Sequence, residues 1–295
     1  MTAELGILLA LCCAFATNLG FFYKHRGACS VPKVDIRHPL RTAGQLWSSK
    51  WFALGMLIAI GAWGFHVAAM AVAPLSVVQV VLAGGVVLIA VMGDRMFGFE
   101  VGKRQWIGLA LTAVGLIMFT VTLPATHGAH SSYSVPAMIA FEAGFFMVGL
   151  VLIFGRQAGA PVEHHGVMLG AAAGLLFGVS DVSIKALTGI IGHHGILGLV
   201  SPWFLMAVAA SIVAFYASAR SFQDGEPIPV IAITGVAANM SAVAGGILVF
   251  GDPMPGDVAG IVIQTLGLLL VVFASALTPA PAAARIGNAP ATAAA

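Results

Sequence analysis

The chain has 295 residues, of which 60% are hydrophobic and only 8% are charged, and its formal net charge is +2. A soluble domain carries about 25% charged residues, so this composition excludes a globule with a water-covered surface. The apolar residues come in runs of about 20, the length that an α-helix needs to cross a bilayer. We therefore predict an all-α, polytopic helix bundle embedded in a membrane.

Nine apolar runs are long enough to be transmembrane helices. Breaks are expected at Pro74 and at Asp252-Pro253, because proline disfavours a helical conformation in the residue before it. The first run follows Glu4 and precedes basic residues, which indicates a reverse-oriented anchor rather than a cleavable signal peptide. The predicted spans cover residues 4–22, 51–72, 74–93, 105–123, 134–154, 166–190, 200–219, 228–250 and 256–277.

The basic residues alternate with these spans. The loops 123–134, 191–199 and 251–256 contain none. Under the positive-inside rule the basic side is cytoplasmic, which places the N-terminus outside and the C-terminus in the cytoplasm. The Ala- and Gly-rich composition suggests a bacterial plasma membrane. Twelve of the thirteen cations fall on the basic side, namely Lys24, Arg26, Lys33, Arg37, Arg41, Lys50, Arg95, Lys103, Arg104, Arg156, Arg220 and Arg285.

The same pattern divides the chain into segments. The first helix (1–22) leads into a basic cytoplasmic loop (23–50), which sets the topology or, alternatively, lies against anionic headgroups. Two repeats (51–123 and 134–277) follow, and the Ala- and Pro-rich tail (278–295) is expected to be disordered.

The two repeats share an ordered set of residues. Each has a proline, an apolar helix, a Gly-Asp pair and a second helix with two glycines seven residues apart. Because the Gly-Asp pairs fall on opposite sides of the membrane, the copies are expected to be inverted, as in many secondary transporters. The matching sets are Pro74, Gly93-Asp94, Gly108 and Gly115 in the first copy, and Pro227, Gly251-Asp252, Gly260 and Gly267 in the second.

These residues resemble the drug/metabolite transporter superfamily (EamA-like), whose repeats carry Ala-Pro-Leu, a Gly-acid pair and Trp-x-Gly, here Ala73-Pro74-Leu75, Gly93-Asp94 and Trp106-Ile107-Gly108. The nine-span layout is similar to the NIPA-type branch, which includes magnesium transporters. Lys24-His25-Arg26-Gly27 and the stretch around Lys185 also resemble that branch. Trp63 and His66 stand where the branch carries an acid and an amide, and this departure weakens the magnesium implication.

Lys185, the thirteenth cation, follows Asp181 by four residues inside the sixth span. A charge at the bilayer centre costs about 2.5–3.5 kcal/mol on insertion scales, so it must face protein or water. Both charges share a helix face with Gly170, Gly174 and Gly178, and an acid four residues before a base favours an ion pair. The pair either gates a substrate or proton, or is a structural pair that locks the helix.

Other polar residues inside the spans complete the candidate site. Glu142, the only acid in the fifth span, lies at a depth similar to that of Asp181, where it is either a proton carrier, a partner for Lys185, or a hydrogen-bonded structural group. His66, Asn239 and Gln264 either line a substrate path or form hydrogen bonds between helices. Asn18 is expected to be structural, and Trp63 faces lipid, packs, or stacks on an organic substrate.

We predict a secondary transporter of a small polar or amphipathic solute, with Lys185, Asp181 and Glu142 at its core. The alternative is a transporter of Mg²⁺ or another divalent cation, and a membrane scaffold or sensor is a third hypothesis. Catalytic motifs are absent from the sequence, so neither an enzyme, a cofactor nor a bound metal is expected. The partners would be the lipid bilayer and a small-molecule or ion substrate, without nucleic acid. A homodimer stays open, since the glycine stripe could pack within or between chains.

Overall fold

The computed structural model describes residues 2–35, 37–72, 81–82, 84–99, 101–122, 133–195, 199–251 and 254–277, and these residues form helices without a β-strand. The helices are α1 (Thr2–Cys29), α2 (Pro39–Ser48), α3 (Lys50–Val72), α5 (Val87–Phe97), α6 (Lys103–Val121), α7 (Val135–Phe154), the short 3-10 helix η1 (Val162–His164), α8 (His165–His194), α9 (Pro202–Asp224), α10 (Pro227–Phe250) and α11 (Val258–Leu277). Within these residues the prediction of an all-α chain is confirmed.

Six of the described helices are long and apolar enough to cross a membrane: Glu4–Cys29 of α1, α6, α7, Val162–Ile191, α9 and α10. An apolar stretch of α11, Val258–Val271, is shorter. The expected proline break at Pro74 and much of the third predicted span lie outside the described residues, and so does Asp252-Pro253. The count of nine spans therefore stays a prediction.

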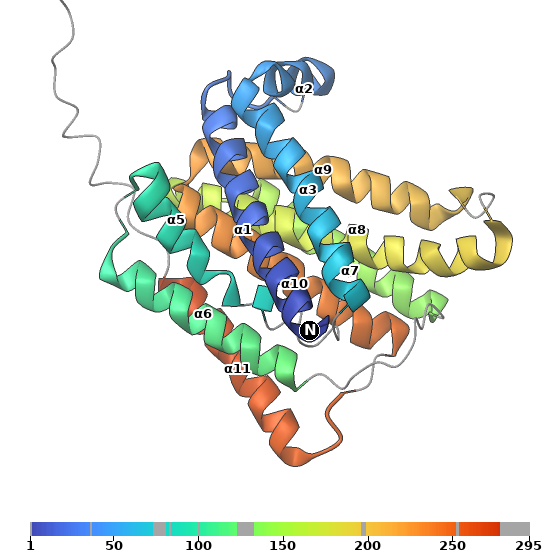
Figure 1. The fold of residues 1–295 in the computed structure, drawn as a ribbon. Coiled ribbons are helices and arrows are strands. Elements are labelled where there is room, and N and C mark those ends of the chain that lie inside the picture. Colours follow the sequence, from blue (N-terminus) through green and yellow to red (C-terminus); the bar gives the residue numbers. More distant parts are fainter. Residues whose placement is uncertain are drawn as a thin grey trace, which may run out of the picture.

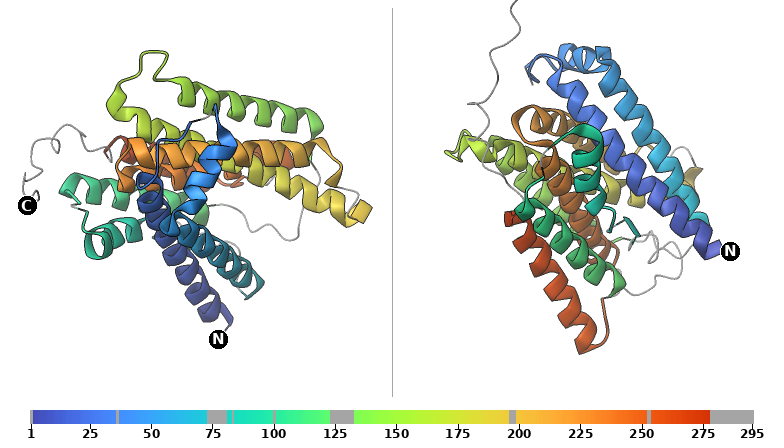
Figure 2. Two further views of the ribbon diagram at one scale, coloured as in Figure 1. Left: turned by 90° about the horizontal axis from the view of Figure 1, so that it is seen from above. Right: turned by 60° about the vertical axis from the view of Figure 1, so that its left-hand side comes forward.

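The helices pack mainly as neighbouring pairs: α1 with α3, α8 with α9 and with α10, and α6 with α11. In Figure 1 the α1–α3 pair crosses in front of α8, α9 and α10. Seen from above, α1 and α3 lie on one side of α10 and α7 lies on the other (Figure 2). The space between the α1–α3 pair and the α8–α10 pair is where the candidate site lies.

Glycines set the distance between these helices. A Cβ on Gly20 of α1 would lie 3.1 Å from the carbonyl oxygen of Gly55 in α3, and a Cβ on Gly115 of α6 would lie 2.7 Å from that of Gly267 in α11. In lipid, helix association depends on such close packing, because the surrounding acyl chains are as apolar as the side chains. These contacts leave no room for a larger side chain at the crossing points.

The predicted glycine stripe packs within the chain. A Cβ on Gly174 would lie 2.7 Å from the Cβ of Ala237, and Cβ atoms on Gly170 and Gly178 would also meet α10. The hydroxyl of Thr234 in α10 donates a hydrogen bond to the Gly170 carbonyl at 3.0 Å. The face of α8 that carries the stripe is therefore covered by α10.

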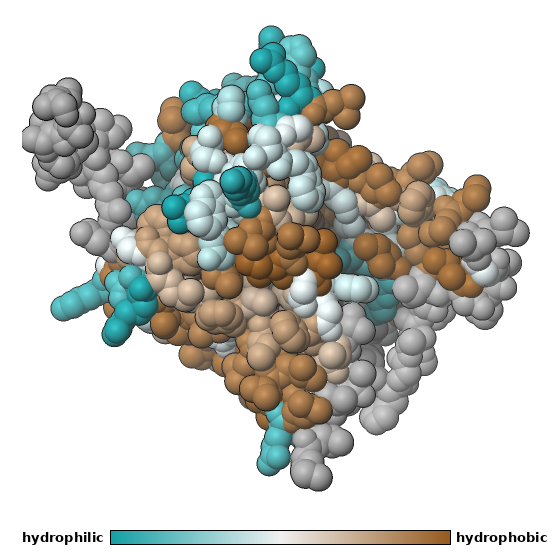
Figure 3. All heavy atoms as spheres, turned by 45° about the horizontal axis from the view of Figure 1, so that its top comes forward, coloured by the Kyte–Doolittle hydropathy of each residue, from teal (hydrophilic) through white to brown (hydrophobic). Residues whose placement is uncertain are grey.

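The ends of several helices meet at one end of the bundle, which we call the basic end. The Gln105 amide at the start of α6 donates to Glu226 beside the start of α10, at 3.4 Å. Lys33, beyond the end of α1, contacts Asp224 at the end of α9 at 3.1 Å. Hydrophilic side chains gather toward one end of the molecule, and hydrophobic ones cover the broad face beside it (Figure 3). The basic segments thus lie together, as the alternation of charges predicts.

Several helices extend beyond their expected ends, among them α8, which reaches His194 rather than residue 190, and α9, which reaches Asp224 rather than residue 219. α1 continues through Cys29 rather than ending at residue 22, and α5 continues past Gly93-Asp94 to Phe97. Phe97 in the extension of α5 packs on α1 where the predicted span ends, stacked on Phe22 at 4.6 Å and edge-on to Tyr23 at 5.7 Å. These aromatic contacts extend both helices beyond the apolar runs. The turn at the end of α5 is made instead by Gly98, whose φ of 67° favours glycine.

Candidate functional site

A cavity of about 450 Å³ lies between the α1–α3 pair, α5, α8 and α10. Its walls are largely apolar, with Phe21, Trp63 and Phe177 among the aromatic residues. Polar side chains interrupt these walls, which is the pattern of small-molecule sites, where a few polar groups fix a ligand in an apolar cleft. The polar lining residues are Cys13, Thr17, Asn18, Lys24, His66, Asp181, Thr234 and Asn239.

Three of the six predicted site residues meet in this cavity: Asp181 from α8, His66 from α3 and Asn239 from α10. Asp181 and His66 each lie 16 residues after the starts of their helices at His165 and Lys50. At about 1.5 Å per residue, each is about 24 Å along its helix from that start. The polar groups therefore meet well inside the bundle rather than at its surface loops.

The sequence places Asp181 close to α10. It is one helical turn beyond Gly178, and the close approach of α8 to α10 along the glycine stripe brings it near Asn239. Its side chain is exposed within the structure because it faces the cavity rather than a packed core. Asp181 is the only carboxylate among the described residues that line this cavity.

The expected ion pair between Asp181 and Lys185 is not formed between these two described residues. The ammonium nitrogen of Lys185 lies 4.2 Å from the centre of the Phe250 ring, a cation–π contact at the end of α10. The long side chain of Lys185 extends from α8 to this ring at the end of α10. Lys185 does not line the cavity, so a gate made of this pair has no support from the geometry.

Glu142 lies on the opposite side of α8. It is 2% exposed, and the Ser183 hydroxyl donates a hydrogen bond to its Oε1. Ser183 and Asp181 are two residues apart, about 200° around the helix. The body of α8, which carries Asp181, therefore separates Glu142 from the cavity.

Gln264 on α11 is also outside the cavity. It is buried, and its Nε2 has no hydrogen-bond partner among the described residues. His66 has a comparable unpaired atom, Nδ1, for which the described part of the chain supplies no partner. His66 itself is among the residues that line the cavity.

The sequence interpretation did not include the contribution of α1. Lys24 was assigned to the basic loop and Asn18 to a structural role, yet both line the cavity. Asn18 also has the expected structural contact, since its Nδ2 donates to the Gly85 carbonyl at 3.1 Å. The available signal was the helical spacing of Cys13, Thr17 and Lys24, which places them on one face of α1.

A cage of ionic ligands is not part of the described structure. No group of three or more His, Cys, Asp or Glu side chains that could hold a metal ion occurs in the described residues. A cation in the cavity would meet one carboxylate, the Lys24 ammonium group and neutral oxygen or nitrogen atoms of the described residues. Such a set suits an ion that keeps much of its water shell.

The sequence has a curated relative. A protein of Arabidopsis thaliana described as probable magnesium transporter NIPA9 is 23% identical over 277 residues, which cover 91% of this chain and 80% of the relative. No protein-family model and no solved structure matches the chain. Together with the six long apolar helices, this similarity supports a membrane transporter with a NIPA-like relation.

Proposed function

We propose that the chain is a secondary transporter that binds its substrate in the cavity around Asp181 and releases it by alternating access. The observation that carries this proposal is the meeting of Asp181, His66 and Asn239 from three helices in one cavity. An ionisable group inside a membrane bundle is costly, so such groups commonly mark substrate or ion pathways. Asp181 is the residue that we assign to substrate binding.

The substrate that fits best is a hydrated divalent cation, with Mg²⁺ first. Mg²⁺ binds protein through one or two carboxylates and keeps several waters. Six waters occupy about 180 Å³ at about 30 Å³ each, so the ion and its first shell fit into a cavity of about 450 Å³. The sequence argument against a cation was a lysine beside the acid. That argument loses force for Lys185, because its ammonium lies against Phe250. The lysine that does line the cavity is Lys24, on the separate helix α1.

A small polar or amphipathic organic solute is the second candidate. Two features of the cavity favour it: the aromatic walls, and the presence of Lys24 and Asp181 on the same lining surface. Aromatic rings bind apolar parts of a solute, and the two charges suit the opposite charges of an amino-acid-like zwitterion. This candidate requires Lys24 as well as Asp181, whereas a cation requires only the acid.

Alternating access would use the inverted repeat. Gly115 and Gly267 hold corresponding positions in the two predicted copies, and they contact each other across the α6–α11 crossing. A contact between equivalent positions supports a twofold relation between the copies, the usual plan for rocking transporters. The predicted orientation, with the N-terminus outside, belongs to the same proposal.

The remaining predicted site residues would couple transport rather than touch the substrate. Glu142 is buried against Ser183 of α8, so protonation of this acid would change the contact between α7 and the helix that carries Asp181. We assign Glu142 to proton coupling. Lys185 and Gln264 would hold α8 and α11 in place from outside the cavity.

The experiment is uptake by purified protein in liposomes that contain a magnesium-sensitive dye, with and without a pH gradient, alongside radiolabelled zwitterionic amino acids. Wild type should admit Mg²⁺, and Asp181→Asn should slow entry on the order of tenfold or more, equivalent to about 1.4 kcal/mol. Glu163→Gln, which neutralises an exposed acid outside the cavity, is the matched control. Equal uptake by wild type and Asp181→Asn would refute the assignment. Amino-acid uptake lost in both Asp181→Asn and Lys24→Met would favour the second candidate.

A further inference from the structure

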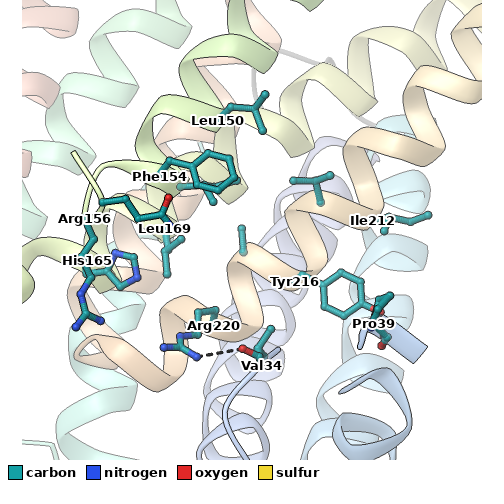
Figure 4. Close-up of a pocket in the computed structure, with 14 residues that line it drawn as sticks. Val34, Pro39, Leu150, Phe154, Arg156, His165, Leu169, Ile212, Tyr216 and Arg220 are labelled. Atoms are coloured by element: carbon teal, nitrogen blue, oxygen red, sulfur yellow. Dashed lines mark hydrogen bonds between the residues drawn. The ribbon is translucent and has the colours of Figure 1, made fainter. Parts of the chain in front are cut away.

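A second cavity, of about 710 Å³, lies at the basic end between α7 and α9, which both pack on α8. The segment that follows α1 closes one side of it through Val34 and Pro39. Figure 4 shows how its lining is divided: Leu150, Phe154 and Ile212 are toward one end, and Arg156, His165 and Arg220 are toward the other. The cavity is therefore amphipathic along its length.

The charged end of this cavity has more positive than negative groups. Asp224 is beside it and pairs with Arg220 at 2.6 Å and with Lys33 at 3.1 Å. The Arg220 guanidinium also donates to the Val34 carbonyl at 3.1 Å (Figure 4). Arg156, by contrast, makes no ion pair or hydrogen bond through its guanidinium with any described residue, so its charge is uncompensated at the cavity.

An unpaired buried atom points to a ligand at the same place. The His165 side chain is 11% exposed, and its Nε2 lies 3.7 Å from Asp224. Its other ring nitrogen, Nδ1, is buried with no hydrogen-bond partner in the described residues. Buried polar atoms are normally satisfied by protein, water or ligand. A phosphate group between His165 and Arg156 would accept a hydrogen bond from the Arg156 guanidinium and, with the imidazole proton on Nδ1, from His165.

The apolar end of the cavity favours a lipid over a soluble anion. α7 and α9 are both candidate membrane spans, and Phe154 and Ile212 are 43% and 52% exposed, as expected of side chains that face acyl chains. α7 ends at Phe154, so Arg156 follows directly on the end of a span. Basic pockets between transmembrane helices at this level suit the headgroups of anionic lipids.

We propose that this cavity is a binding site for one anionic phospholipid, whose phosphate contacts Arg156 and His165 and whose acyl chain lies along Leu150, Phe154 and Ile212. The bound lipid would bridge α7 and the last turns of α9. Because the segment with Val34 and Pro39 also lines the cavity, the lipid would hold that segment against α9. This site is separate from the Asp181 cavity and does not depend on the identity of the transported substrate.

The test uses full-length protein, purified and delipidated in a neutral detergent, and measures its thermal unfolding midpoint as lipid is added. A ligand that binds the folded state raises the midpoint. Phosphatidylglycerol should raise it, whereas phosphatidylcholine and inorganic phosphate should not. Native mass spectrometry should show one phosphatidylglycerol retained.

Arg156→Ala should raise the phosphatidylglycerol concentration for half the effect about tenfold, because the lipid phosphate loses a hydrogen bond from a charged donor. Arg156→Lys should retain most of the effect, and Leu150→Trp should abolish it by filling the apolar end. Arg104→Ala, at the start of α6 and outside the cavity, is the matched control and should bind as wild type does. An equal loss in Arg104→Ala, or an equal response to phosphatidylcholine or to inorganic phosphate, would overturn the proposal.

Discussion

The close contact between α8 and α10 leads to a prediction about Gly174→Ala. The added Cβ would meet the backbone carbonyl oxygen of Thr234 first, and it would lie 2.7 Å from the Cβ of Ala237 and 3.0 Å from the backbone nitrogen of Ala238, whereas ordinary contact begins near 3.4 Å. The helices would have to separate by more than the about 0.7 Å that the Ala237 contact alone requires, because the Thr234 and Ala238 atoms are backbone and cannot rotate away. Overpacking of this kind costs about 1–3 kcal/mol.

Gly144→Ala in α7 is the matched control. Gly144 is also a helical glycine, but a Cβ there meets nothing within 4 Å. Both substitutions gain the same helix propensity, about 1 kcal/mol, so their difference isolates the packing term. We expect the free energy of unfolding of Gly174→Ala to be about 1–3 kcal/mol below that of Gly144→Ala, measured by denaturant unfolding in detergent. Equal stability of the two variants would show that the helices are not in contact at Gly174.

Three further predictions concern single side-chain contacts. Asp224→Asn should lower the free energy of unfolding by about 1–3 kcal/mol, because Arg220 and Lys33 lose their charged partner; an unchanged thermal midpoint would contradict a stabilising role for this cluster. Ser183→Ala should reduce stimulation of uptake by a pH gradient, because it removes the hydrogen bond to Glu142; if the ratio of uptake with and without the gradient is the same as in wild type, Glu142 does not couple through Ser183. A double-mutant cycle of Lys185→Met and Phe250→Leu should give a coupling energy of about 0.5–2 kcal/mol for the cation–π contact. A coupling energy of zero would show that this contact does not stabilise the protein.

The positions of the charges along the chain predicted which segments lie together, because placing a charge inside a bilayer costs free energy. Lys33, Arg156 and Arg220 belong to segments far apart in the sequence, and they lie at one end of the bundle, as the alternation of basic loops predicts. The glycine stripe of α8 could likewise be interpreted from the sequence as a helix-packing face. In a membrane, a stripe of residues without side chains permits close contact between helices. The sequence did not show that α10 is the partner helix.

The composition of the site was harder to predict. Asp181, His66 and Asn239 were expected together and do line one cavity. Glu142 was expected beside them because its depth matches that of Asp181, but depth does not say which side of α8 an acid meets. Lys24 was assigned to a loop because it follows the apolar run, whereas aromatic packing of Phe22 on Phe97 accompanies a longer α1 that carries Lys24 into the lining.

The sequence by itself determined that this is a membrane bundle, which of its segments lie together at the basic end, and which few polar residues are inside the spans. These properties depend on the free energy of transferring each residue from water into lipid, and this free energy can be estimated one residue at a time. Only the tertiary structure decided that Asp181 faces a cavity while Lys185 lies against Phe250. The rotation and pairing of the helices set those neighbours, and they depend on contacts between residues that are distant in the sequence.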